Sequence, residues 1–238
     1  MKTDLLVFGA HSDDVELSCS GTILKHISMN KKVVVIDLTQ GELGTRGNAE
    51  LRKQEAEKSS AILGLHGREC LQMQDGFFQN DSEHQRKVIE VIRKYQPEIV
   101  LCNAVSDRHP DHARAGKLVA EACFYSGLLK LETQYNNIPQ QPWRPNAVYH
   151  YVQDRYVEPD FVIDVTAFAE KKRESISAYA SQFYKPDSTE PETPISSPEF
   201  IESVFAKMAV FGRSIGVRYA EGFQTERIPG VDSLFNLL

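Results

Sequence analysis

The amino-acid sequence predicts an α/β fold, a Rossmann-like three-layer sandwich built on a mostly parallel sheet. Short apolar runs typical of buried strands alternate with helical patterns, and the early runs stop at polar or glycine-rich loops. The connections are long enough for right-handed crossovers, which parallel neighbours require. With 238 residues and 41% hydrophobic content the chain buries a sizeable core. We expect a single domain over residues 1–238.

The first two strands and their helices are the clearest elements. Residues 4–10 (DLLVFGA) are apolar and stop at a polar loop, and residues 32–38 (KVVVIDL) suit a strand covered on both faces. Residues 17–30 carry apolar side chains at helical positions. Residues 49–63 do the same, and Gly64 offers a natural helix end.

The later elements continue this alternation but become less regular. We expect strands at 70–73, 98–103, 147–152 and 161–165, and helices at 82–95, 112–125, 168–180 and 199–211. Asp81 or Ser82 should cap the helix that ends before Pro97. Residues 185–198 contain Pro186, Pro191, Pro194 and Pro198 and should form a loop. This loop is either a cover over the site or a plain surface connection.

Charge and composition argue against several kinds of partner. The chain has 27 Lys and Arg against 33 Asp and Glu, a net charge of -6, and its basic residues are scattered. We therefore expect no nucleic-acid partner. The first apolar run ends before Asp13 and Asp14, too early for a signal peptide or a membrane span, so we expect a soluble, cytoplasmic protein without a membrane partner. The four cysteines form no CxxC pair and should be reduced.

Two loops hold most of the side chains that bind metals. The sequence AHSDDVE follows the first strand and contains His11, Asp13 and Asp14, while HPDH, residues 109–112, follows the fourth. In open parallel sheets, ligands bind outside the carboxyl ends of the strands, where both loops emerge. His26, His66, His84 and His150 stand alone and are interpreted as surface or core residues. Glu16 is interpreted as a cap of the following helix.

These two loops predict a metal site. His11, Asp14 and His112 supply two imidazoles and one carboxylate, the set expected of hydrolytic Zn²⁺ with positions left for water. The same set binds Fe²⁺ in non-haem oxygenases, so iron is the alternative metal and an oxygenase the alternative enzyme. A dinucleotide-binding module would need G-x-G-x-x-G after the first strand, where this chain has carboxylates instead.

The motif AHSDDVE followed by HPDH resembles the LmbE-like or PIG-L deacetylase superfamily, whose first motif is usually AHPDDxE. TQGELGTRG, ELRKQEA, YASQFY and GVRYAEGF are similar to its bacillithiol-pathway branch. This resemblance implies a Rossmann-like fold, one zinc ion, a homohexamer and removal of acetyl from N-acetylglucosaminyl malate. Another N-acetylglucosamine conjugate, such as an inositol conjugate or a chitooligosaccharide, is the alternative substrate. Ser12 stands where the family commonly has proline.

The resemblance makes His11, Asp14 and His112 the metal ligands and Asp13 the general base. A leaving amine must be protonated and an oxyanion stabilised, and His109 is the candidate for both tasks. We expect Asp111 to orient His109. The alternative is that Asp111 bonds the second nitrogen of a metal-bound histidine.

Arg52 is the candidate for binding a substrate carboxylate, because a guanidinium group matches carboxylate geometry. The malate half of the implied substrate carries two such groups. The other interpretation of Arg52 is an arginine on the helix surface. Glu42 and Arg46 in the glycine-rich loop either face the substrate or are solvated charges, as loop charges usually are.

Overall fold

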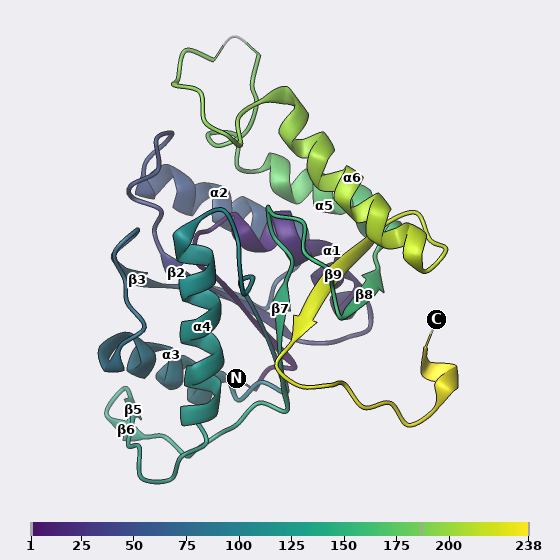
Figure 1. Cartoon of the computed structure of the whole chain (residues 1–238). Coiled ribbons are helices and arrows are strands. Elements are labelled where there is room, and N and C mark those ends of the chain that lie inside the picture. Colours follow the sequence, from purple (N-terminus) through teal and green to yellow (C-terminus); the bar gives the residue numbers. More distant parts are fainter. Residues whose placement is uncertain (1, 187, 238) are drawn as a thin grey trace.

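A seven-stranded sheet forms the centre of the protein, whose computed structural model describes residues 2–186 and 188–237 (Figure 1). Its order is β3-β2-β1-β4-β7-β9-β8. The strands are β1 (Leu5–Gly9), β2 (Val33–Thr39), β3 (Gly67–Met73), β4 (Ile99–Cys102), β7 (Ala147–Tyr151), β8 (Phe161–Asp164) and β9 (Ala220–Thr225), and a separate pair is formed by β5 (Gln134–Tyr135) and β6 (Ile138–Pro139). The neighbouring strands β3, β2, β1, β4 and β7 run parallel, whereas β9 is antiparallel to both of its neighbours, β7 and β8. The predicted fold class is confirmed.

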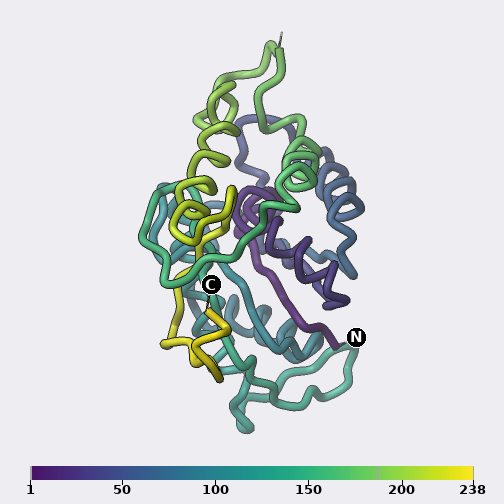
Figure 2. The backbone as a smooth tube through the Cα atoms, turned by 90° about the vertical axis from the view of Figure 1, so that its right-hand side faces the viewer, coloured from purple at the N-terminus to yellow at the C-terminus, as the bar shows by residue number. Residues whose placement is uncertain are grey.

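Helices cover both faces of this sheet and produce three layers (Figures 1 and 2). The helices are α1 (Asp14–Ser28), α2 (Ala49–Leu63), α3 (Ser82–Tyr95), α4 (Pro110–Tyr125), α5 (Ala169–Ser177) and α6 (Pro198–Ser214), with short 3₁₀ turns at η1 (Thr166–Phe168) and η2 (Leu234–Asn236). Side chains of β1 alternate between the faces. Leu6 and Phe8 pack with α3 and α4, while Leu5 and Val7 pack with α1.

The middle helices have the bounds that their end signals predict. Asn48 caps α2 by accepting a hydrogen bond from the Leu51 N–H at 2.9 Å, and Gly64 ends the helix at φ 71°. Asp81 caps α3 in the same way, so the predicted bounds of both helices are confirmed.

Three helices begin earlier than predicted: α6 by one residue, and two others at the site. α1 begins at Asp14 instead of residue 17, and α4 at Pro110 instead of residue 112. Acidic side chains in a first turn are stabilised by the helix dipole, and proline suits the first helical position. The prediction placed the starts of α1 and α4 after these residues, so it missed their polar first turns. The site residues are therefore held by helix starts instead of free loops.

The second half departs further from prediction. β9 was not predicted, because Glu221 and Gly222 interrupt its apolar pattern. α5 stops at Ser177, short of residue 180. The predicted loop 185–198 is confirmed up to residue 197, apart from residue 187, which lies outside the described residues. Pro198 is already the first residue of α6, which ends at Ser214 instead of residue 211.

The sheet reverses its direction of growth between β1 and β4. β1 pairs with β2 on one side and β4 on the other, and the helices after β1 and β4 lie on opposite faces. Such a switch point leaves a crevice at the carboxyl ends of the two strands. No helix within residues 2–186 and 188–237 has the length and apolar character needed to cross a membrane.

Candidate active site

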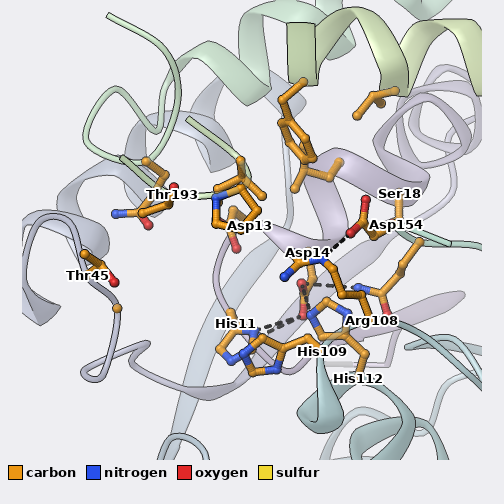
Figure 3. A pocket seen from close by; sticks show the side chains of 18 of the residues that line it. His11, Asp13, Asp14, Ser18, Thr45, Arg108, His109, His112, Asp154 and Thr193 are labelled. Carbon is orange, nitrogen blue, oxygen red and sulfur yellow. Dashed lines mark hydrogen bonds and ion pairs between the residues drawn. The ribbon is translucent and has the colours of Figure 1, made fainter. Parts of the chain in front are cut away.

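A cavity of about 570 Å³ opens at the carboxyl ends of β1 and β4 (Figure 3). Its inner wall consists of side chains from the two loops and helix starts: His11, Asp13, Asp14, His109 and His112. Its outer wall comes from the second half of the chain: Thr193, Pro194, Ile195, Phe200, Ser203, Val204 and Lys207. The predicted site residues and the predicted loop thus face each other across one cavity.

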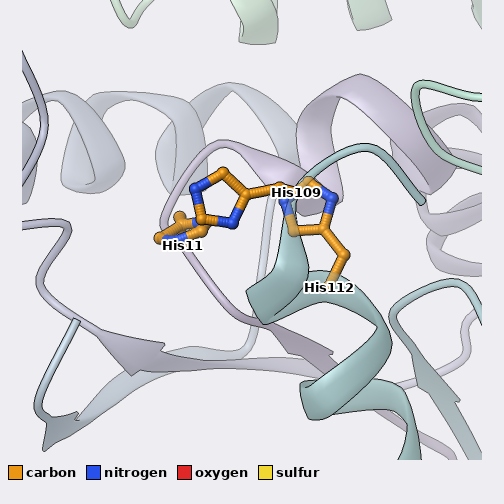
Figure 4. A group of neighbouring side chains, drawn as sticks. All are labelled: His11, His109 and His112. Atoms are coloured by element: carbon orange, nitrogen blue, oxygen red, sulfur yellow. The ribbon is translucent and has the colours of Figure 1, made fainter. Parts of the chain in front are cut away.

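The inner wall brings the three predicted metal ligands together. His112 Nε2 lies 3.1 Å from Asp14 Oδ1, and His11 Nδ1 lies 3.7 Å from Asp14 Oδ2. All three residues are buried. His109 adds a third imidazole, and the three histidines each offer a ring nitrogen within 4.8 Å of the others (Figure 4).

Asp14 is fixed by donors from three segments. Its carboxylate accepts hydrogen bonds from the His11 backbone N–H at 3.0 Å, from Asn103 Nδ2 at 2.9 Å and from Gln153 Nε2 at 3.2 Å. Asn103 and Gln153 were not predicted as site residues. Asn103 directly follows β4, so its position was a usable signal, whereas Gln153 has no local motif.

Two further carboxylates stand behind the histidines and were also missed. Asp107 Oδ2 lies 2.5 Å from His112 Nδ1, and Asp75 Oδ1 lies 3.1 Å from His11 Nε2. Carboxylates in this position fix the orientation of metal-binding imidazoles. Asp107 lies in the sequence SDRHPD directly after β4, so its position near the metal-type residues was a usable signal. Asp75 reaches the site from the end of β3.

The protonation of this cluster indicates what kind of ligand it suits. Burial opposes a charge on His112, but the charge of Asp14 and the hydrogen bond to Asp107 raise its pKa to about 9. Burial likewise opposes a charge on His11, whose pKa is nevertheless raised well above the usual value by hydrogen bonds to Asp111, Asp14 and Asp75. In the absence of a metal, the raised pKa values favour a proton on both His11 and His112, and these two positive charges offset the charges of the surrounding aspartates. A divalent cation carries the same charge, so the donor set fits a divalent metal.

Asp13 and Arg52 form a buried pair beside the cluster. Arg52 Nη2 lies 3.2 Å from Asp13 Oδ1, and Arg52 Nη1 donates to the Gly41 carbonyl at 3.3 Å. Gly41 has φ 64°, a conformation that favours glycine, and a Cβ atom there would lie 2.0 Å from Arg52 Nη1, so any other residue would displace the guanidinium group. Arg52 is 5% exposed and lines the cavity, which excludes the helix-surface interpretation. It already contacts the predicted base.

Asp111 does not contact His109 through its carboxylate, which corrects the expected pairing. Its Oδ2 lies 3.6 Å from His11 Nε2 and accepts from the Gly76 N–H, while Oδ1 accepts from Arg114 Nη1 at 2.7 Å. The alternative partner, a histidine of the ligand set, matches this geometry. The reason is local: His109 is the cap of α4, and its Nδ1 faces the Asp111 backbone N–H at 3.3 Å.

His109 has a protonation state of its own. Burial first, and then the charges of His11 and His112, lower its pKa below the usual value. A neutral imidazole still offers a ring N–H, but it carries no charge near pH 7.

Glu16 is more than the helix cap that the sequence indicated. Its Oε1 accepts hydrogen bonds from Ser59 Oγ at 2.6 Å and from Arg68 Nη1 at 2.7 Å, and it is fully buried. Arg68 and Tyr179 also both donate to the Ser12 carbonyl. This network holds the turn before Asp13 from behind and gives the motif YASQFY a structural role.

Arg46 is also not a solvated loop charge. It is 5% exposed and donates from Nε to the Pro191 carbonyl at 2.8 Å and from Nη1 to the Phe183 carbonyl at 3.3 Å. Thr193 and Ile195 line the cavity beyond these bonds. The proline-rich loop therefore covers the site and is tied to the glycine-rich loop.

Comparisons with known proteins agree with this geometry. Residues 6–123 match the PIG-L family, described as GlcNAc-PI de-N-acetylase. The chain is similar to diacetylchitobiose deacetylase of Thermococcus kodakarensis (30% identity, 95% of this chain and 84% of that protein) and to a probable N-acetyl-alpha-D-glucosaminyl L-malate deacetylase 2 of Bacillus anthracis (28%, 75% and 80%).

A solved structure extends the similarity to the whole fold. The conserved protein TT1542 from Thermus thermophilus superposes with a TM-score of 0.86 at 31% identity, covering 97% of this chain and 98% of that one. With its two motif loops meeting at one metal-type cluster, the chain belongs to the PIG-L family and is a hydrolytic N-deacetylase.

Proposed function

We propose that this chain is a zinc-dependent enzyme that removes the acetyl group from N-acetyl-α-D-glucosaminyl L-malate in bacillithiol biosynthesis. The observation that carries the proposal is the meeting of His11, Asp14 and His112 on the wall of a cavity large enough for a sugar conjugate. Two imidazoles and one carboxylate are the ligand set of hydrolytic zinc sites, with Fe²⁺ as the alternative metal.

His11, Asp14 and His112 would hold the ion. When bound, it supplies polarisation of the amide carbonyl and a lowered pKa of water. Asp107 and Asp75 keep the two imidazoles oriented for this task.

Asp13 accepts the proton of the attacking water, as a general base must lie within hydrogen-bond reach of that proton. The ion pair with Arg52 holds one oxygen of Asp13, which orients the carboxylate. Arg52 also lines the cavity, so it remains the candidate for contact with a substrate carboxylate.

His109, neutral near pH 7, donates a hydrogen bond from its ring N–H to the developing oxyanion. To serve as the acid it would first take up a proton from solvent, deliver that proton to the leaving amine and return to the neutral form. Its lowered pKa suits a group that gives up a proton readily once it carries one. Asp111, by its contact with His11, acts as a positioning residue for a ligand and not as the partner of His109.

A cationic corner supports a substrate with a carboxylate. It consists of Arg108 and Lys207, which both contact Asp154: Arg108 Nε lies 2.5 Å from Asp154 Oδ2, and Lys207 Nζ donates to the Asp154 carbonyl at 3.3 Å. All three residues line the cavity. Arg108 pairs with the Asp154 carboxylate, whereas Lys207 contacts the uncharged Asp154 backbone carbonyl, so the charge of Lys207 favours an anionic group such as malate.

A chitooligosaccharide is the second candidate substrate. The similarity to diacetylchitobiose deacetylase covers 95% of this chain and supports a neutral disaccharide. Phe200 and Tyr156 line the cavity and offer the apolar faces that sugar rings contact.

The test compares acetate release by the zinc-loaded protein from N-acetylglucosaminyl malate, diacetylchitobiose and an N-acetylglucosaminyl inositol. We expect the highest kcat/KM for the malate conjugate. A higher value for the disaccharide would assign the second substrate, and no release from any of them would reject all of the proposed substrates. The family resemblance also supports a homohexamer, which sedimentation of the purified protein would test.

A further inference from the structure

Helix α1 is kinked five residues after Asp14. The backbone leaves the helical region at Cys19 (φ -138°, ψ 15°), so two helical segments share one axis only approximately. The first segment carries Asp14, and its residues Leu17 and Ser18 line the cavity. The direction of this short segment therefore sets the backbone position from which the Asp14 carboxylate reaches its donors on His11, Asn103 and Gln153.

Two charged side chains enter the hydrogen-bond ladder at the kink. In a regular helix the Gly21 N–H would donate to the Leu17 carbonyl. Instead, the Gly21 and Thr22 N–H groups donate to the Glu221 carboxylate at 3.0 and 2.7 Å, and the Leu17 carbonyl accepts from Lys172 Nζ at 2.9 Å. Insertion of side chains into the ladder is an established cause of helix kinks.

The inserted groups form an ion pair sealed inside the protein. Lys172 Nζ lies 2.7 Å from Glu221 Oε1, and the two residues are 0% and 1% exposed. Lys172 comes from α5 and Glu221 from β9, so the pair joins three elements. The approach is close: a Cβ atom at Gly21 would lie 3.0 Å from Glu221 Oε1 and 2.8 Å from Val165 Cβ.

We propose that Lys172 and Glu221 are positioning residues, which hold the kink of α1 so that Asp13 and Asp14 face the cavity in the orientation that metal binding and proton transfer need. This inference rests on the proposed function. It also gives a role to Glu221 of the motif GVRYAEGF, which touches none of the inner-wall residues through the contacts described for residues 2–186 and 188–237.

Stability alone does not account for this pair. A buried ion pair costs desolvation, and apolar side chains of similar volume often replace it without loss of stability. Such a replacement would let Gly21 donate to Leu17 again and straighten α1. The function of the pair is therefore separable from its contribution to stability.

The test is the double variant K172M/E221M, in which both charges are removed and side-chain volume is roughly kept. We expect it to fold, with weaker zinc binding by roughly 10–100-fold, the range seen when groups that orient metal ligands are lost. We expect kcat to fall with zinc at saturation while KM changes little, because Asp13 turns with the segment. Zinc affinity is measured by competition with a chromophoric chelator, and folding by thermal unfolding.

The matched control is K94M/E69M, which removes the 2.5 Å ion pair between α3 and β3, away from α1. It should keep zinc affinity and kcat. E221Q is the milder test, because the amide oxygen of glutamine can still accept a hydrogen bond from the Gly21 N–H. The losses of zinc affinity and kcat should therefore be smaller than in K172M/E221M. K172R keeps the charge and should stay nearest to the unmodified protein.

Zinc affinity and kcat equal to the unmodified protein in folded K172M/E221M would overturn the proposal. Failure of both K172M/E221M and E221Q to fold would also reject it, since the pair would then serve folding alone. Zinc binding without deacetylation of any conjugate by the unmodified protein would reject the proposed function instead, and the affinity measurement would still decide the role of the pair.

Discussion

The two walls of the cavity are built by different rules. On the inner wall, buried side chains from the starts of α1 and α4 are tied to one another and to carboxylates behind them. On the outer wall, apolar residues such as Ile195, Phe200 and Val204 dominate, and they come from a loop and one helix of the second half. The contrast suggests a division of tasks: the inner wall holds the chemistry and the outer wall selects the substrate.

Removal of the metal should have the largest effect, because it acts on the inner wall as a whole. We expect about one zinc per chain, and dialysis against a chelator should reduce kcat by about a thousandfold or more, since a metal contributes several kcal/mol of charge stabilisation. Zinc added back should restore it. Full activity in protein that metal analysis finds empty would rule out the proposed chemistry.

Asp13→Asn should come next, with a loss of roughly 10²–10⁴ in kcat, the usual contribution of a general base. Zinc content should stay normal, because Asp13 is not in the ligand set. The control is Asp81→Asn, a cap of α3 at which asparagine caps equally well, so turnover and stability should be unchanged. Near-normal turnover of Asp13→Asn would exclude Asp13 as the base.

Asp107→Asn tests the shell behind the ligands. Loss of the charge facing His112 Nδ1 should weaken zinc binding by roughly 10–100-fold, with a smaller change in kcat at saturating zinc. Unchanged zinc affinity in a chelator competition would show that Asp107 only packs against the ring.

The outer wall should respond to pH in a substrate-dependent way. Burial lowers the pKa of Lys207 to about 8, with Asp154 and Asp107 opposing and Lys172 assisting the shift. Lys207 is charged below this pH and neutral above it, so KM for the malate conjugate should rise by about fivefold through pH 8, as for the loss of an ion pair worth about 1 kcal/mol. K207M should lack this step, and diacetylchitobiose should not show it. The same step with both substrates would contradict the selective role.

Ser12→Ala should have the smallest effect. The Ser12 hydroxyl is buried and has no hydrogen-bond partner within the described residues, which costs free energy. We expect the free energy of unfolding to rise by up to about 1 kcal/mol, with kcat unchanged. Destabilisation in a denaturant titration would mean that the hydroxyl binds a group such as ordered water.

Prediction from sequence worked where the signals were local. The bounds of α2 and α3 followed from Asn48, Gly64 and Asp81, whose capping depends on neighbouring residues only. β9 was not predicted because the charged Glu221 interrupts its apolar pattern, although the strand lies inside the sheet between β7 and β8. The charge of Glu221 serves the kink of α1, whose residue Gly21 is 200 positions away in the sequence.

The same distinction holds within the site. Metal-type side chains crowd into two motifs at strand ends, so the meeting of His11, Asp14 and His112 on one wall of the cavity was predictable, and their role as metal ligands stays a prediction. The positions of Asp75 and Gln153 were not predictable, because they enter from the ends of other strands and only the order of strands brings them to the same edge. The partner of Asp111 depends on helix-cap geometry, so the sequence alone left it open between His109 and a metal-bound histidine.

The anchoring of the cover has a consequence for how such enzymes diverge. Arg46 binds the carbonyl oxygens of Phe183, Glu190 and Pro191, and every residue type supplies a carbonyl. The side chains around these anchor points can therefore mutate without breaking the attachment. The residues that face the substrate can therefore be replaced while the attachment of the loop and the inner wall stay the same.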